Sequence, residues 1–155
     1  VLPEGYVPEL AELLKSRLRV TLGDEISRVR FLPAMSNKDY MNVMALADVS
    51  LDTRPFGGGN TSWQAIAAGT PVVTWPGAFL RGRYTQALYR LLGVTDAIAG
   101  SANQYIKLAV KFGTDRAFAE QYNRRVAEAA PSIFADNVHV DALYEFLVDQ
   151  VRSGI

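Results

Sequence analysis

The apolar residues of this chain alternate between short continuous runs and stripes with helical spacing. Short apolar runs at residues 29–33, 47–52, 71–75 and 96–99 predict strands. Apolar positions three or four residues apart predict helices over residues 8–20, 36–46, 62–68, 83–92, 103–112, 115–129 and 138–152. Strands that alternate with helices are typical of βαβ units. We therefore expect an α/β fold with a Rossmann-like parallel sheet covered by helices on both faces.

Several predicted helix ends coincide with residues that favour a boundary. Ser36 can cap the second helix, and Asp39, three residues later, completes a near-capping box. Gly69 and Gly93 each follow the last apolar position of a helix, where glycine is the preferred residue. These signals support the predicted order of elements.

Three consecutive glycines, residues 57–59, connect the second predicted strand to the next helix. Glycine lets the backbone approach an anion closely. The free N–H groups in the first turn of a helix then point at that anion, together with the positive end of the helix dipole. The loop therefore predicts a phosphate site.

Composition excludes several other kinds of site. The 155 residues are 49% hydrophobic, which predicts one soluble globular domain with a real core. Sixteen basic residues balance sixteen acidic ones, so nothing favours nucleic acid or an anionic membrane as partner. One histidine and no cysteine exclude a His/Cys metal cluster and a disulfide framework. With no targeting segment evident, we expect a cytoplasmic protein without metal or cofactor.

Several segments in fixed order resemble the C-terminal catalytic lobe of O-GlcNAc transferases and their SPINDLY-type relatives, glycosyltransferase family 41. They are residues 31–33, 47–53, 58–62, 68–74 and 76–77, within a similarity that runs from about Arg28 to Phe112. The resemblance implies one lobe, the C-terminal half, of a GT-B glycosyltransferase. Residues 1–155 would form a single UDP-sugar-binding lobe, with a Rossmann-like core to about residue 112 and C-terminal helices over 113–155.

The same resemblance implies which residues bind the UDP-sugar. Asn60, Thr61 and Ser62 match the segment that holds the pyrophosphate, and Tyr40 matches the position of a ring stacked on uracil. The full set of UDP-sugar-binding residues is Met35, Asn37, Tyr40, Gly58, Gly59, Asn60, Thr61, Ser62, Gln64 and Arg83. Arg83 would also stabilise charge on the departing UDP.

Two positions depart from the family pattern. Gly59 stands where the animal enzymes have a histidine, so a side-chain donor is lost there. Gln64 stands where an acidic residue usually receives the ribose hydroxyls. An amide still accepts these hydrogen bonds without charge assistance, at a cost of about 1 kcal/mol.

The chain resembles a fragment of a larger enzyme. Its apolar opening, Val1–Glu4, looks like the tail of a strand. The catalytic base is expected outside this chain, and the protein acceptor would bind through a missing N-terminal lobe or helical repeats. Alone, the chain should bind a UDP-sugar weakly and catalyse little.

Three function classes are weighed. The first is the UDP-GlcNAc-binding lobe of an inverting protein glycosyltransferase, with a UDP-glucose-using lobe as its nearest variant. The second is a dinucleotide-binding domain. The glycines argue against it, because they do not follow the spacing Gly-x-Gly-x-x-Gly. The third is a non-catalytic interaction domain that has kept the fold without the ligand.

Other polar and aromatic residues are expected to serve the structure. Asp52 ends a strand before a loop, where an aspartate often accepts hydrogen bonds from turn amides. Trp63 and Trp75 are predicted to pack in the core. His139 lies far in sequence from every motif and is expected to be structural.

Overall fold

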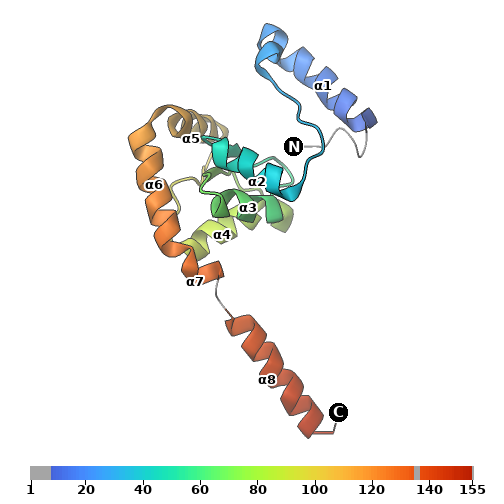
Figure 1. Ribbon diagram of the computed structural model, residues 1–155, viewed down its shortest axis with the longest axis vertical. Coiled ribbons are helices and arrows are strands. Elements are labelled where there is room, and N and C mark those ends of the chain that lie inside the picture. The colour runs from blue at the N-terminus through green and yellow to red at the C-terminus, as the bar shows by residue number, and fades with distance from the viewer. Residues whose placement is uncertain (1–7, 135–136, 155) are drawn as a thin grey trace. The chain divides into compact units, whose positions relative to one another are not determined.

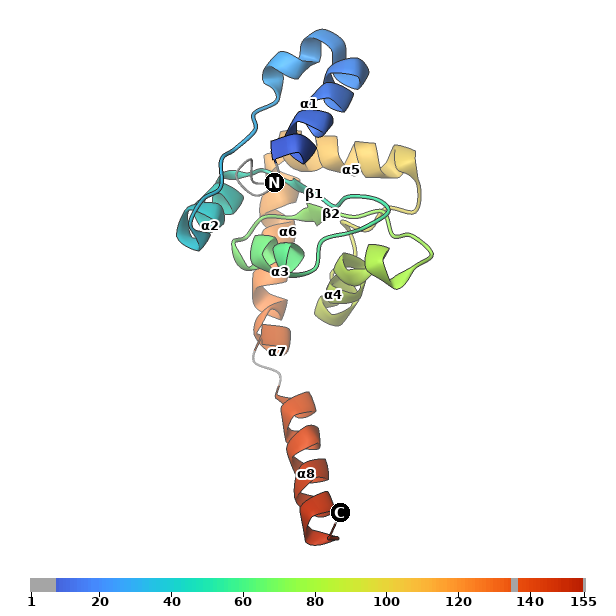
Figure 2. The ribbon, with the colours of Figure 1, turned by 90° about the vertical axis from the view of Figure 1, so that its right-hand side faces the viewer.

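Figures 1 and 2 show a computed structural model of the chain, which describes residues 8–134 and 137–154. The predicted strand tail at Val1–Glu4 lies outside the described residues. The chain divides into two compact units, one ending at Tyr40 and the other beginning at Met41.

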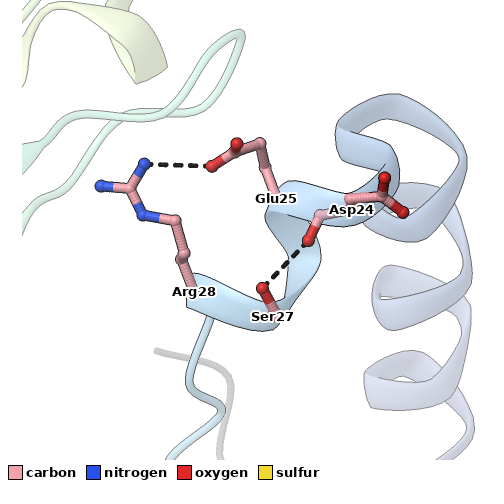
Figure 3. A network of polar contacts seen from close by, with 4 residues as sticks. All are labelled: Asp24, Glu25, Ser27 and Arg28. Atoms are coloured by element: carbon pink, nitrogen blue, oxygen red, sulfur yellow. Dashed lines mark hydrogen bonds and ion pairs between the residues drawn. The ribbon is translucent and has the colours of Figure 1, made fainter.

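The first unit contains helix α1 (Pro8–Leu22), the 3₁₀ helix η1 (Gly23–Arg28) and the start of α2 (Asn37–Leu46). In η1, Arg28 pairs with Glu25 at 3.0 Å, and the Ser27 hydroxyl donates to the carbonyl of Asp24 (Figure 3). All of these contacts join residues three apart, so they stabilise this turn and nothing beyond it.

Two predictions for the first unit have different outcomes. The cap at α2 is confirmed: the Ser36 hydroxyl accepts the Asp39 N–H at 3.2 Å and donates to the Asp39 carboxylate at 2.7 Å. The predicted strand at residues 29–33 is wrong, because this segment forms no regular element and pairs with no strand among the described residues. An apolar run becomes a strand only where another backbone accepts its hydrogen bonds.

The second unit has a small parallel sheet. Strand β1 (Ser50–Leu51) pairs with β2 (Val72–Val73) in the register Ser50↔Val72 and Leu51↔Val73. Thr74 forms a further parallel bridge with Ile98. The complete Rossmann-like sheet that was predicted is not seen among the described residues. Pro71 and Pro76 bracket β2, and a proline lacks the N–H that would extend the ladder.

Helices lie on both sides of these strands. The second unit contains η2 (Leu80–Gly82) and the helices α3 (Asn60–Ala67), α4 (Tyr84–Leu92), α5 (Ala102–Thr114), α6 (Arg116–Ala129), α7 (Pro131–Phe134) and α8 (Val138–Arg152). Figure 2 shows α5 on one side of the strands and α3 and α4 on the other. Gly93 ends α4 in the left-handed region, at φ 67°. None of the helices described is both long and apolar enough to cross a bilayer.

The core surrounds β2. Its buried members include residues of β2, α3, α4, α5 and α6: Ile66, Val72, Val73, Leu88, Tyr89, Leu92, Phe112, Tyr122 and Val126. Because α6 contributes Tyr122 and Val126 to this core, the helix after residue 112 packs with the strands in one unit.

Two fully buried tyrosines differ in their hydrogen bonding. The Tyr89 hydroxyl accepts the N–H of Val72 at 2.8 Å, and burial raises the pKa of Tyr89 to about 12. The Tyr122 ring packs edge-on against the Tyr89 ring, and its hydroxyl lies near that of Tyr89 without forming a hydrogen bond of good geometry to any described residue. A buried polar group with a partner stabilises the fold, whereas one without a partner weakens it.

This contrast predicts opposite effects of removing the two hydroxyls. Tyr89→Phe leaves the buried Val72 N–H without its acceptor and should lower the free energy of unfolding by about 1–3 kcal/mol. Tyr122→Phe removes an unsatisfied group and should leave that free energy unchanged or higher. Urea denaturation of both variants measures the difference, and an equal loss in both would contradict it.

Candidate functional site

The site begins where β1 ends. Parallel strands present their carboxyl ends at one edge of a sheet, and ligands of α/β folds bind outside that edge. After β1, the chain passes through Asp52 and the glycines into α3; after β2, it passes through η2 into α4. Both connections therefore leave the same edge.

The Asp52 carboxylate fixes the glycine loop. One of its oxygens accepts the N–H of Gly58 at 2.6 Å, and the other accepts the Thr74 hydroxyl at 2.6 Å. The side chain is buried, and Tyr105 donates to its main-chain carbonyl at 2.9 Å. The role predicted for Asp52, accepting a turn amide, is confirmed.

Gly57 and Gly58 are needed for packing within the loop itself. A Cβ at Gly57 would lie 2.9 Å from a carboxylate oxygen of Asp52. A Cβ at Gly58 would collide with the Ser62 hydroxyl and lie 2.8 Å from the Thr61 hydroxyl. A Cβ at Gly59 would meet nothing within 4 Å, so that side of the loop is open.

A buried pair of hydroxyls joins the first turns of α3 and α4. Ser62 Oγ and Thr85 Oγ1 lie 2.8 Å apart, and both residues are almost fully buried. Thr85 also lies 3.5 Å from the carbonyl of Gly58. The N-terminal ends of two helices, each carrying partial positive charge, therefore meet beside the glycine loop (Figure 2).

Three backbone N–H groups at the start of α3 have no hydrogen-bond acceptor among the described residues. The N–H groups of Ser62 and Trp63 both donate to the carbonyl of Gly59, at 3.0 and 3.3 Å. Within residues 8–134 and 137–154, no acceptor hydrogen-bonds the N–H of Gly59, Asn60 or Thr61. Neighbouring free N–H groups at a helix start form an anion site.

The other residues of the second unit that were predicted to bind the UDP-sugar lie in α3 or directly before α4. Thr61 is exposed, with its hydroxyl beside Gly58. Arg83 stands at the N-cap position of α4 without a capping side-chain bond; it is exposed and donates weakly to Gln86 at 3.4 Å. Gln64 is half-buried one turn into α3. The Ser62 hydroxyl pairs with Thr85 and its N–H donates to the carbonyl of Gly59, so its assignment to the phosphate stays a prediction.

Three further predicted residues belong to the first unit. Met35 and Tyr40 are half-buried and Asn37 is exposed; burial raises the pKa of the Tyr40 hydroxyl. The structure groups the phosphate-site residues with one another and leaves these three in the other unit. Their assignment to the UDP-sugar stays a prediction.

The two tryptophans have different surroundings. Trp63 packs against the core, as predicted, and meets the ring of Phe134 edge-on at 5.2 Å. Trp75 is not part of the core; the guanidinium carbon of Arg54 lies 3.6 Å from its ring centroid. His139 is exposed on α8.

Sequence reasoning missed Thr74 and Thr85. Both are buried hydroxyls that hold the glycine loop, and each is distant from it in sequence. No spacing rule marks a threonine as the partner of a residue more than twenty positions away.

Comparisons with known proteins show which family the chain resembles. The family model described as "Glycosyl transferase family 41" matches residues 7–140. The protein from Petunia hybrida called "Probable UDP-N-acetylglucosamine--peptide N-acetylglucosaminyltransferase SPINDLY" is 32% identical over 95 residues, 61% of this chain and 10% of that one. The Caenorhabditis elegans UDP-N-acetylglucosamine--peptide N-acetylglucosaminyltransferase is 33% identical over 96 residues, 62% of this chain and 8% of that one. The chain thus spans about a tenth of these relatives.

A solved structure also matches. It is a mutant of the O-GlcNAc transferase of Thermobaculum terrenum, with a TM-score of 0.70 and 30% sequence identity. The match covers 77% of this chain and 24% of that one. This likeness supports the prediction that the chain folds as part of a GT-B lobe. Since the family model matches most of the sequence, the chain belongs to glycosyl transferase family 41.

Proposed function

We propose that this chain is the sugar-nucleotide-binding lobe of an inverting glycosyltransferase that acts on protein side chains, with UDP-GlcNAc as donor. The main support is the set of N–H groups of Gly59, Asn60 and Thr61, which have no acceptor in the part of the chain that the structure describes and lie beside the joined N-terminal ends of α3 and α4. The names of the relatives support the donor and the acceptor class.

The geometry suits the departure of a nucleoside diphosphate. When the sugar leaves, negative charge grows on the pyrophosphate, and fixed dipoles stabilise that charge without reorganising. In this proposal, the three N–H groups and the Thr61 hydroxyl bind a phosphate, and Arg83 adds a full positive charge at the start of α4. The acceptor's proton would leave through a base outside this chain.

Uridine and ribose would be held by the rest of the predicted set. Tyr40 would stack on uracil beside Met35 and Asn37, while Gln64 would accept from the ribose hydroxyls. UDP-glucose is the second candidate donor, because nothing in the loop distinguishes the two sugars. No metal or further cofactor is proposed.

Removing the Thr61 hydroxyl tests the phosphate site. Thr61→Val deletes a donor to the phosphate while preserving side-chain shape, so affinity for UDP should fall about tenfold. Isothermal calorimetry or NMR titration of the chain with UDP measures the change. UDP affinity should be weak even before substitution, because part of the nucleotide site is expected outside this chain.

The matched control is Thr114→Val, which removes an exposed threonine hydroxyl from the end of α5. It should leave the affinity for UDP unchanged. If Thr61→Val bound UDP as well as the control does, the loop would not be the phosphate site. If the unsubstituted chain bound no UDP at millimolar concentration, an interaction domain without ligand would be favoured instead.

Two neighbouring glycines offer a second test of the loop. Gly58→Ala forces the hydroxyls of Thr61 and Ser62 aside and should lower the free energy of unfolding by about 1–3 kcal/mol. The same change should weaken UDP binding. Gly59→Ala places its methyl group in open space and should change stability by less than about 0.5 kcal/mol. Thermal unfolding of both variants compares them, and equal destabilisation would contradict the described loop.

A further inference from the structure

Two loops next to the phosphate site are rich in arginine and aromatic residues. Residues 53–57 and 75–84 contain three arginines and no acidic residue. We define the arginine–aromatic rim as Arg54, Phe56, Trp75, Phe79, Leu80 and Arg81. It excludes Arg83, which is assigned above to the donor.

Backbone contacts hold the two loops together. The N–H of Gly57 donates to the carbonyl of Arg81 at 2.8 Å and joins the two loops, while the N–H of Gly77 donates to the carbonyl of Gly82 at 3.2 Å within the second loop. Gly82 approaches the other loop so closely that a Cβ would lie 2.9 Å from the carbonyl of Pro55. The rim is therefore a fixed surface built from both loops.

Both rim arginines are stacked on aromatic rings. The guanidinium carbon of Arg54 lies 3.6 Å from the Trp75 centroid, and that of Arg81 lies 4.7 Å from the Phe79 centroid. A stacked guanidinium keeps its N–H edge available for a carboxylate. Among residues 8–134 and 137–154, the ion pairs are formed by other cations, so neither rim arginine has an acidic partner.

Apolar surface accompanies this charge. Phe56 and Phe79 are each 64% exposed, and Leu80 is 70% exposed. Beside Trp75 lies an open cavity of about 340 Å³, lined also by Asp52, Thr53, Arg54, Ala102, Tyr105 and Ile106. The Asp52 carboxylate is already bound to Gly58 and Thr74. The rim thus offers both charged and apolar contacts to one partner.

We propose that the arginine–aromatic rim docks an acidic segment of a polypeptide, with carboxylates on Arg54 and Arg81 and an apolar side chain in the cavity beside Trp75. The inference rests on the proposed function, in which this polypeptide is the protein acceptor. Unpaired cations favour an anionic occupant, and the exposed rings favour one that also carries apolar side chains. A free phosphate meets only the first requirement, and a flat lipid surface does not fill a recessed cavity.

Binding of designed peptides to the chain tests the rim. The probe is a fluorescein-labelled peptide that mixes glutamate with leucine, compared with the same peptide carrying glutamine for glutamate. Fluorescence anisotropy should show the acidic peptide binding about tenfold more tightly. Added salt should weaken this preference, because charge pairs at a surface are screened. Equal binding of both peptides would overturn the proposal.

Substitutions assign the effect to the rim. The double variant Arg54→Gln and Arg81→Gln should abolish the preference for the acidic peptide. The matched control Arg124→Gln, at an exposed arginine on α6, should preserve it. The assignment would be overturned if the double variant kept its preference for the acidic peptide, or if only the Arg124→Gln control lost it.

UDP binding separates this inference from the proposed function. The double variant should bind UDP as the unsubstituted chain does. If UDP displaced the acidic peptide, or the double variant lost UDP affinity, the rim would belong to the nucleotide site and the proposal would fail. Binding of phosphatidylserine vesicles through the same arginines, without peptide binding, would also overturn it. Peptide binding without UDP binding would support the rim and count against the proposed function.

Discussion

The glycine loop depends on one buried carboxylate. Asp52 ends β1, and its two oxygens connect the loop, through the Gly58 N–H, with the end of β2, through the Thr74 hydroxyl. A buried carboxylate without such partners would be strongly unfavourable. The charge therefore selects the loop conformation in which both donors reach it. Because the Gly58 N–H is used in this way, the free donors are those of the next three residues.

The link between Ser62 and Thr85 adds a second constraint. It is a neutral hydroxyl pair, and it brings together two helix ends of like partial charge. Such an arrangement is unfavourable by itself and becomes favourable when an anion lies in front of both ends. This is a physical reason, independent of any likeness to relatives, to expect a phosphate at this edge of the sheet.

Features set by neighbouring residues were predicted better from the sequence than features set by tertiary contacts. Helix positions, the cap at Ser36 and the stop at Gly93 followed from spacing and from single residues, and all are present. The strands were predicted too long, since a strand requires a partner that an apolar run cannot specify. In the site, Asp52 was predicted from its place before a turn. Thr74, Thr85 and the stacking of Arg54 on Trp75 depend on tertiary contacts and left no local signal.

The loop and the rim would recognise anions by different means. Backbone N–H groups on a loop fixed by Asp52 have one geometry, which suits a ligand of constant shape such as a pyrophosphate. Stacked guanidinium groups are preorganised in plane but remain at the ends of side chains, so they can follow carboxylates whose positions differ from one polypeptide to another. Because Gly57 and Arg81 hydrogen-bond each other, the two surfaces share a backbone. A polypeptide on the rim would therefore be held beside the loop proposed to bind the donor phosphate, which is the proximity that transfer between two bound substrates requires.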